Sequence, residues 1–325
     1  MILNIIYLLL GMAFIVGGAH FLTEGAVSMA RKWGISPLVI GLTIVAFGTS
    51  MPELAVSCIS ALKGNPDIAI GNVIGSNIFN IFMILGITAM ITPLKISIST
   101  VKVEIPLVIL ASVVLFVMAM DITISGQTMN ILSRGDGIVL LAFFIIFLAY
   151  TFAISKKQKP SSKEEDQEFS DIKVYATWLS ILMFLGGLGA LIFGGDAFVK
   201  GASGIALSFG VSQSLIGLTI VAMGTSLPEL ATSIAAALKK QPDIAVGNVV
   251  GSNIFNIFFI LGVSSTITPI RPSGIGMIDY IVLMISAVML CIFALFFGKK
   301  TITRGEGLVL TLCMIAYTSF LIYQG

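Results

Sequence analysis

Two acidic residues stand inside long apolar stretches of the sequence, each within the same short motif. Glu53 belongs to GTSMPE and Glu229 to GTSLPE. An ionised carboxylate in hydrocarbon costs roughly 3 kcal/mol or more unless a partner compensates it, so an acid at membrane depth is a candidate functional group. A bound cation is the obvious compensation. The alternative is a protonated carboxyl that only bridges two helices.

The residues around each glutamate offer further oxygen atoms. Pro52 and Pro228 lack an N–H, so the carbonyls of Gly48 and Gly224, four residues earlier, lose their helical partners and the turn opens. The same motifs carry the hydroxyls of Thr49, Ser50, Thr225 and Ser226. Each threonine precedes its glutamate by four positions and shares its helix face. Hard cations such as Na⁺ and Ca²⁺ prefer this mixture of carboxylate, hydroxyl and carbonyl oxygen.

A second motif follows each glutamate and reads GNVIGSNIFN or GNVVGSNIFN. Its polar residues recur every four positions and predict one polar stripe per helix, formed by Asn72, Ser76 and Asn80 and by Asn248, Ser252 and Asn256. We expect the stripes to face the glutamates, with hydrogen bonding between helices as the other interpretation for Asn72 and Asn248. Asn77 and Asn253 lie off the stripes and are expected to be packing or capping groups. The glycines of the motif allow close helix packing.

Both motifs belong to an internal repeat. Residues 41–86 and 217–262 align without a gap at an offset of 176, and 35 of the 46 positions are identical. Self-similarity of this length indicates two copies of one structural unit.

The elements that carry these motifs are predicted to be membrane helices. The composition is 57% hydrophobic and 10% charged, which is too apolar for a water-exposed surface. It also lacks a basic cluster of the nucleic-acid-binding type. Ten apolar stretches are long enough to span a bilayer, namely 2–30, 36–63, 70–91, 103–120, 136–155, 174–202, 212–238, 246–267, 279–298 and 305–323.

One charged segment, 156–173, divides the chain. It contains five lysines and five acids and lacks an apolar period, so it predicts a solvated linker between an N-terminal half (1–155) and a C-terminal half (174–325). If the linker is cytoplasmic, fourteen of the eighteen Lys and Arg residues face inside and three face outside. This positive-inside bias predicts a multi-pass protein of the cell membrane with both termini outside.

Five spans in each half require the two repeats to enter the membrane from opposite sides. We therefore predict an all-α integral membrane protein of ten transmembrane helices in two inverted five-helix repeats. Many secondary transporters have this architecture and bind substrate near the bilayer midplane. Glycines in the first and sixth spans, such as Gly18 and Gly194, permit either sliding of these helices or plain close packing.

The paired motifs resemble the two repeats of the calcium/cation antiporter superfamily, especially the prokaryotic sodium/calcium exchangers, and the resemblance covers nearly the whole chain. It implies exchange of Na⁺ for Ca²⁺, usually three to one, without a cofactor. It also implies that Glu53 and Glu229 bind both ions. The other implied ligands are the side chains of Thr49, Ser50, Thr225, Ser226, Ser76, Asn80, Ser252 and Asn256 and the carbonyls of Ala46 and Ala222.

Several alternatives stay open at this point. Potassium-dependent relatives resemble this pattern but carry Asp in place of Asn256, and proton/calcium exchangers usually carry a GNxxE-type motif, so both couplings are disfavoured. A cation channel would use similar ligands in a continuous pore. An intramembrane hydrolase would need a base, and His20 is the single histidine of the sequence, so we expect no enzyme activity. The expected partners are Na⁺, Ca²⁺ and the lipid bilayer, with no nucleic acid, and a monomer is the simplest arrangement.

Overall fold

The computed structural model describes residues 1–126, 128–157, 174–209, 222–271, 275–297 and 300–324. The described residues form an almost entirely helical structure, which confirms the predicted all-α class. The exceptions are two strands of two residues each. The predicted linker lies outside the described residues from position 158 onward, and so do positions 212–221 of the seventh predicted span.

Eight helical segments of the described chain are long and apolar enough to cross a membrane. They are Ile2–Trp33, Pro66–Ile91, Thr100–Ala119, Arg134–Ala153, Thr177–Ser208, Pro242–Ile267, Met277–Phe297 and Arg304–Tyr323. Each overlaps one of the predicted spans. The helices Pro37–Thr49 and Met51–Leu62 form a ninth span if they are counted together, and Leu227–Leu238 is a shorter apolar helix.

The chain divides into two compact units. Unit 1 consists of Met1–Thr49 and Leu148–Asn248, and unit 2 of Ser50–Phe147 and Val249–Gly325. Each unit therefore contains segments from both sides of the predicted linker. Two helices, α9 (Arg134–Lys157) and α15 (Pro242–Ile254), begin in one unit and end in the other.

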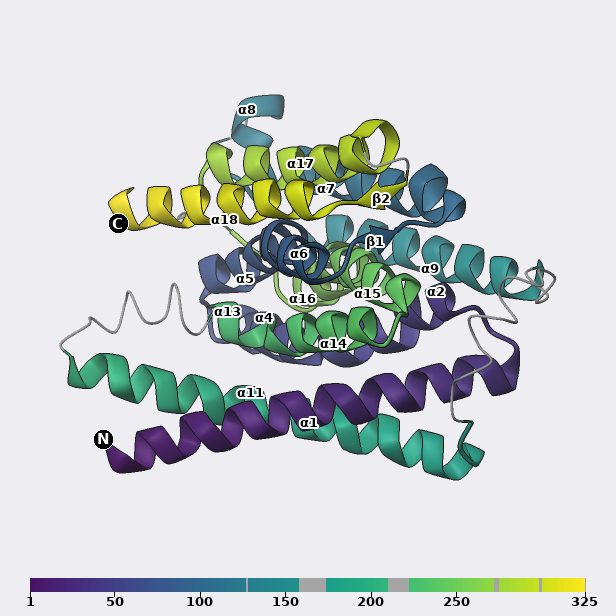
Figure 1. Ribbon diagram of the computed structural model, residues 1–325. Coiled ribbons are helices and arrows are strands. Elements are labelled where there is room, and N and C mark those ends of the chain that lie inside the picture. The colour runs from purple at the N-terminus through teal and green to yellow at the C-terminus, as the bar shows by residue number, and fades with distance from the viewer. Residues whose placement is uncertain (127, 158–173, 210–221, 272–274, 298–299, 325) are drawn as a thin grey trace. The chain divides into compact units, whose positions relative to one another are not determined.

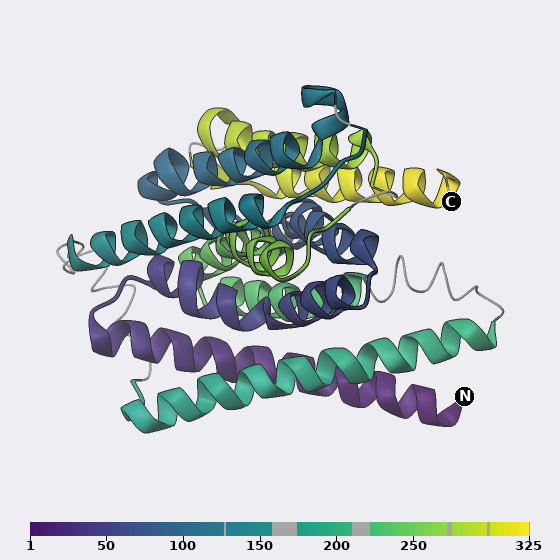
Figure 2. The same ribbon diagram turned by 180° about the vertical axis from the view of Figure 1, so that it is seen from behind.

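Unit 1 is built on two helices of 32 residues each. Its elements, where η denotes a π-helical segment, are α1 (Ile2–Trp33), α2 (Pro37–Ile40), η1 (Gly41–Val45), α3 (Ala46–Thr49), α11 (Thr177–Ser208), α13 (Ala222–Thr225), α14 (Leu227–Leu238) and parts of α9 and α15. Figures 1 and 2 show α1 and α11 crossing along their length. Helix α1 ends at Gly34, whose φ of 62° suits the left-handed cap that glycine adopts without strain.

Glycines set the distance between α1 and α11. A Cβ atom at Gly18 would lie 2.8 Å from the backbone oxygen of Gly187, and one at Gly11 would lie 2.8 Å from the backbone oxygen of Gly194. Neither position has room for a side chain, so the backbones pack directly, as small residues allow in membrane helices. Because Gly11 meets Gly194 and Gly18 meets Gly187, the two helices run antiparallel.

Unit 2 contains a core of buried helices. Its elements are α4 (Met51–Leu62), α5 (Pro66–Phe79), η2 (Asn80–Leu85), α6 (Gly86–Ile91), β1 (Leu94–Lys95), η3 (Thr100–Glu104), α7 (Ile105–Ala119), α8 (Asp121–Ser125), η5 (Phe255–Leu261), α16 (Gly262–Ile267), α17 (Met277–Ile292), η6 (Phe293–Phe297), β2 (Thr301–Ile302), α18 (Arg304–Gln324) and parts of α9 and α15. Helix α5 packs against η5, and α18 packs against α6 and η2. Phe144 of α9 meets Phe255 edge-to-face at a centroid distance of 4.8 Å, a favourable aromatic geometry.

Unit 2 also contains short extended segments, which helix periodicity did not predict. Strands β1 and β2 are antiparallel, with Leu94 opposite Ile302. Leu132 and Ile270 form an isolated antiparallel bridge. In the first pair the segment after α6 meets the segment before α18, and in the second pair the segment after α16 meets the segment before α9.

Candidate functional site

Each glutamate motif lies where a helix is interrupted. Ser50, with φ −84° and ψ 9°, separates α3 from α4, and Ser226, with φ −91° and ψ 6°, separates α13 from α14. The new helix has proline in its first turn in both cases, where its missing N–H needs no helical partner. The helix breaks predicted from Pro52 and Pro228 are therefore confirmed.

The two glutamates lie in the first turns of the helices that follow these breaks. Glu53 and Glu229 are each only 1% exposed. The positive end of a helix dipole stabilises a negative charge within this first turn. Each carboxyl is thus buried at the one end of a helix that favours its ionised form.

An asparagine from the following helix holds the Glu53 region within unit 2. Asn72 of α5 donates through Nδ2 to the backbone oxygen of Glu53 at 3.2 Å and to Ser57 Oγ at 3.0 Å. Ser57 Oγ also donates to the backbone oxygen of Ala69 at 3.1 Å. We refer to Glu53, Ser57 and Asn72 as the Glu53 packet.

Unit 1 contains the corresponding group from the second repeat. Asn248 of α15 donates through Nδ2 to the backbone oxygen of Glu229 at 3.3 Å and to Ser233 Oγ at 3.0 Å. Its Oδ1 accepts a hydrogen bond of 3.1 Å from Thr49 Oγ1. We refer to Glu229, Ser233 and Asn248 as the Glu229 packet. Asn72 and Asn248 thus make the interhelical hydrogen bonds that were one of the two interpretations of these residues.

The structure places the predicted ligands in two groups, one in each unit. Unit 1 holds Ala46, Thr49, Ala222, Thr225, Ser226 and Glu229. Unit 2 holds Ser50, Glu53, Ser76, Asn80, Ser252 and Asn256. Within unit 1, Asn248 joins Thr49 to Glu229. Thr225 is partly exposed, and Glu53, Glu229 and the hydroxyl and amide side chains of the other predicted ligands are buried.

Comparison with protein-family models identifies the family of this chain. The family model described as sodium/calcium exchanger protein matches residues 3–153 and 179–323. The chain belongs to the sodium/calcium exchanger family.

Individual proteins of related sequence match nearly the whole chain. The inner membrane protein YrbG of Escherichia coli is 35% identical over 333 residues, covering 99% of this chain and 97% of YrbG. The sodium/calcium exchanger MaX1 of Methanosarcina acetivorans is 31% identical over 346 residues, covering 98% and 99%. A structure of the sodium-calcium exchanger NCX_Mj soaked with 2.5 mM Na⁺ and 0.1 mM Ca²⁺ superimposes with a TM-score of 0.82 at 34% identity, covering 98% of each chain.

Four polar residues of this exchanger-family chain were not singled out as parts of the site by the sequence. Ser57 and Ser233 hold the asparagines of the two packets, and their spacing of four residues after each glutamate was a usable signal. Asn77 and Asn253 link helices of unit 2, as a packing role implies, but they also contact two predicted ligands. Their position off the polar stripe concealed this contact.

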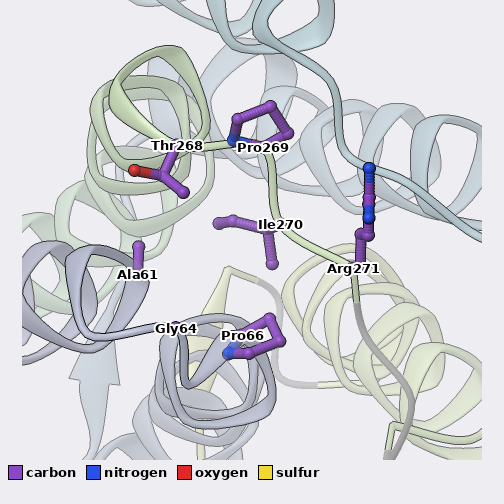
Figure 3. A pocket seen from close by; sticks show the side chains of 7 residues that line it. All are labelled: Ala61, Gly64, Pro66, Thr268, Pro269, Ile270 and Arg271. Carbon is purple, nitrogen blue, oxygen red and sulfur yellow. The ribbon is translucent and has the colours of Figure 1, made fainter.

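The surface cavity of unit 2 shown in Figure 3 is a different kind of site. It measures about 350 Å³ and is lined by Ala61, Gly64, Pro66, Thr268, Pro269, Ile270 and Arg271. Its one charged side chain is a cation, Arg271, which disfavours a bound cation by repulsion. It contains none of the predicted ligands.

A second polar group of unit 1 joins α1, α14 and the segment before α11. Lys239 Nζ lies 2.9 Å from Glu24 Oε1, and Tyr175 donates through its hydroxyl to Glu24 Oε2 at 3.0 Å. This hydrogen bond to a carboxylate raises the pKa of the Tyr175 phenol. The group ties α1, α14 and the segment before α11 together within unit 1.

Proposed function

We propose that this chain is an antiporter that exchanges Na⁺ for Ca²⁺ across the cell membrane by alternating access. One observation carries the proposal: a buried glutamate, placed at a helix break and held by an asparagine of the next helix, occurs once in each repeat. A carboxylate costs too much at such a position unless a cation compensates it. Membership of the sodium/calcium exchanger family supports these two ions as substrates.

In this proposal the predicted ligands of both repeats bind the transported ions. Glu53 and Glu229 provide charge, while the hydroxyls of the GTS motifs, Ser76, Ser252, Asn80 and Asn256 provide neutral oxygen donors. The carbonyl oxygens of Ala46 and Ala222 complete the set. Carboxylate, hydroxyl, amide and carbonyl oxygens are the donors that Na⁺ and Ca²⁺ prefer.

The proposed architecture is ten transmembrane helices in two inverted halves, 1–155 and 174–325, joined by the linker 156–173. Contacts within unit 1 support the inversion. Gly11 and Gly18 of the first half correspond to Gly187 and Gly194 of the second half, at the offset of 176. Gly11 meets Gly194, which is the repeat partner of Gly18, and Gly18 meets Gly187, which is the repeat partner of Gly11. The two helices run antiparallel. A two-fold axis in the membrane plane produces this exchange of partners.

Unit 2 repeats the same relationship. A Cβ atom at Gly86 would lie 2.9 Å from the backbone oxygen of Gly307, and one at Gly137 would lie 2.8 Å from that of Gly262. Gly86 and Gly262 are repeat partners, and Gly137 and Gly307 hold the same place in SRGDG and TRGEG. Contacts that recur between exchanged partners support two halves related by a two-fold axis.

The proposed orientation places both termini outside and the linker in the cytoplasm. It rests on the distribution of Lys and Arg along the sequence. One chain carries both repeats, so a monomer embedded in lipid contains every proposed ligand.

The charge on the site predicts the electrical behaviour of the exchange. Two glutamates carry charge −2, which one Ca²⁺ neutralises, whereas three Na⁺ leave the loaded site at +1. One net charge then crosses per cycle, and 100 mV contributes about 2.3 kcal/mol to its movement. Shared ligands prevent both ion sets from occupying the carboxylates at once, which couples the two fluxes.

Radioactive ⁴⁵Ca²⁺ uptake into proteoliposomes, with gradients of Na⁺, K⁺ and H⁺ imposed one at a time, tests this function. We expect uptake driven by an outward Na⁺ gradient. An inside-positive potential should accelerate it, because each cycle carries one net positive charge outward when three Na⁺ leave for one Ca²⁺ that enters. Uptake driven by H⁺, or by Na⁺ only when K⁺ is present, would replace the proposal with one of the other exchanger classes. Fast Ca²⁺ flux without any counter-gradient would indicate a channel.

A further inference from the structure

Four buried asparagines of unit 2 form one hydrogen-bonded group. Asn77 and Asn80 lie at the end of α5 and the start of η2, and Asn253 and Asn256 lie at the corresponding places of α15 and η5. None of the four is more than 1% exposed. We call this group the asparagine clasp.

Asn77 and Asn253 bind each other's backbone reciprocally. Asn77 donates through Nδ2 to the backbone oxygen of Asn253 at 3.2 Å, and Asn253 donates through Nδ2 to the backbone oxygen of Asn77 at 3.4 Å. Each then accepts through its Oδ1 from the second asparagine of the opposite repeat. Asn80 Nδ2 donates to Asn253 Oδ1 at 3.0 Å, and Asn256 Nδ2 donates to Asn77 Oδ1 at 2.9 Å.

These bonds determine which end of each amide points where. A backbone carbonyl only accepts, so the group that Asn77 and Asn253 each turn towards it must be the NH₂. Their oxygen ends are therefore the ones available to Asn80 and Asn256, which must in turn present NH₂ groups. The orientation of all four amides follows from the network.

The oxygen ends of Asn80 and Asn256 are consequently directed away from the clasp. Within the part of the chain that the structure describes, Asn80 Oδ1 and Asn256 Oδ1 are buried without a hydrogen-bond partner, as is Ser252 Oγ. A buried acceptor without a partner is unfavourable by itself. A desolvated Na⁺ or Ca²⁺ is a partner that an amide oxygen binds well.

We propose that Asn77 and Asn253 are positioning residues that orient the amide oxygens of Asn80 and Asn256 as neutral ligands for the transported cations. This inference rests on the proposed exchange function and adds to it a pair of residues that bind no ion themselves. Each positioning residue acts on the ligand of the opposite repeat: Asn253 on Asn80, and Asn77 on Asn256. Partners that fix the orientation of a metal ligand typically change affinity by about 10- to 100-fold when they are removed.

Double-mutant cycles on the apparent Ca²⁺ affinity of Na⁺-driven uptake in proteoliposomes test the clasp. We expect each single substitution of the four asparagines by alanine to weaken the apparent affinity by about tenfold. Double substitution of a hydrogen-bonded pair, Asn80/Asn253 or Asn77/Asn256, should cause about the same tenfold loss as either single substitution. Once the ligand asparagine is removed, its positioning residue has no amide left to orient. The other pairs, Asn77/Asn80 and Asn253/Asn256, serve as matched controls and should approach about 100-fold by additivity.

The outcomes separate this inference from the function on which it rests. Absence of Na⁺-driven uptake by the unsubstituted protein would contradict the function. Normal affinity in both Asn80→Ala and Asn256→Ala would contradict their role as ligands. If those two variants lose affinity, two further results would overturn the clasp alone. One is normal affinity in Asn77→Ala and Asn253→Ala, and the other is a multiplicative loss in the double variants of the bonded pairs.

Folding is measured separately for the same variants. Thermal unfolding without ions reports stability, and Asn253→Leu retains side-chain volume if Asn253→Ala fails to fold. A purely structural role would lower the unfolding temperature and leave the apparent affinity of the folded protein unchanged, which would also overturn the proposal.

Discussion

The Glu53 packet and the Glu229 packet make the same hydrogen bonds in different units of the molecule. The asparagine-to-serine distance is 3.0 Å in both, and the distances from Nδ2 to the backbone oxygen of the glutamate are 3.2 and 3.3 Å. The residues that make these bonds are identical in the two repeats. The comparison shows that the same polar residues produce the same geometry around each glutamate in both units.

The repeats differ beside these positions. Val56 of the first repeat corresponds to Thr232 of the second, and Gly64 corresponds to Lys240. Thr232 is fully buried, whereas Val56 is partly exposed. These differences test whether equivalence extends beyond the hydrogen bonds that hold the glutamates.

The largest expected effect comes from removing either carboxylate charge. Glu53→Gln and Glu229→Gln should each reduce Na⁺-driven Ca²⁺ uptake by about two orders of magnitude or more, because a cation in the site then loses a buried counter-charge. Uptake of ⁴⁵Ca²⁺ into proteoliposomes measures this. If the packets are functionally equivalent, the two variants lose activity together.

Glu306→Gln is the matched control for this pair. Glu306 is also largely buried, at 8% exposure, but its Oε2 accepts hydrogen bonds from the backbone nitrogen and hydroxyl of Thr303, which a glutamine oxygen can still accept. Uptake should remain near normal in this variant. Normal uptake in only one of the two site variants would show that a single glutamate carries the charge of the site.

A smaller effect is expected when a carboxyl replaces a ligand amide. In Asn256→Asp, an oxygen takes the place of the NH₂ that donates to Asn77 Oδ1 at 2.9 Å, so two acceptors face each other unless the new carboxyl carries a proton. Loss of such a bond costs about 1–3 kcal/mol. The ratio of variant uptake to unsubstituted uptake should therefore fall by about tenfold as pH rises and this carboxyl loses its proton.

Asn80→Asp sharpens the comparison between repeats. Its NH₂ donates to Asn253 Oδ1 at 3.0 Å, so the same change in the ratio with pH is expected. A ratio that is constant from pH 5 to 9 in both variants would contradict the assigned amide orientations, since a rotated Asn77 or Asn253 amide could donate to a carboxylate.

Much of the fold was predictable because its signals are local. Apolar length located eight spans, and Pro52 and Pro228 located the two breaks. The glutamate packets were partly predictable, since the repeated stripe identified Asn72 and Asn248 but left their role open. The asparagine clasp was not predictable, because Asn77 meets Asn253 across 176 positions of sequence and helix periodicity describes only the face of one helix. Strands β1 and β2 escaped prediction for the same reason, as two residues give no period.

Removal of the hydroxyl of Thr232 is expected to stabilise the protein. Its Oγ1 is buried and has no hydrogen-bond partner among the described residues, and an unpaired buried hydroxyl is unfavourable. Thr232→Val, which introduces the residue type of Val56, should stabilise the protein by about 1 kcal/mol in thermal unfolding. Ser233→Ala is the control on the adjacent hydroxyl and should destabilise, because it removes the partner of Asn248. Destabilisation by Thr232→Val would show that the second repeat uses this hydroxyl and differs there from the first.

The smallest expected effect concerns the turns that follow α4 and α14, which share one geometry but not one residue type. Gly64 has φ 75° and donates to the backbone oxygen of Ala61 at 3.2 Å, while Lys240 has φ 58° and donates to that of Ala237 at 3.0 Å. Glycine adopts this left-handed conformation freely, whereas a side chain is strained there by about 1 kcal/mol. Gly64→Ala should therefore destabilise by about 1 kcal/mol, and Lys240→Gly should stabilise by less, because added glycine also gains freedom in the unfolded chain. Thermal unfolding of both variants measures the difference, and a destabilising Lys240→Gly would mean that the lysine side chain contributes more to the second turn than its backbone strain removes.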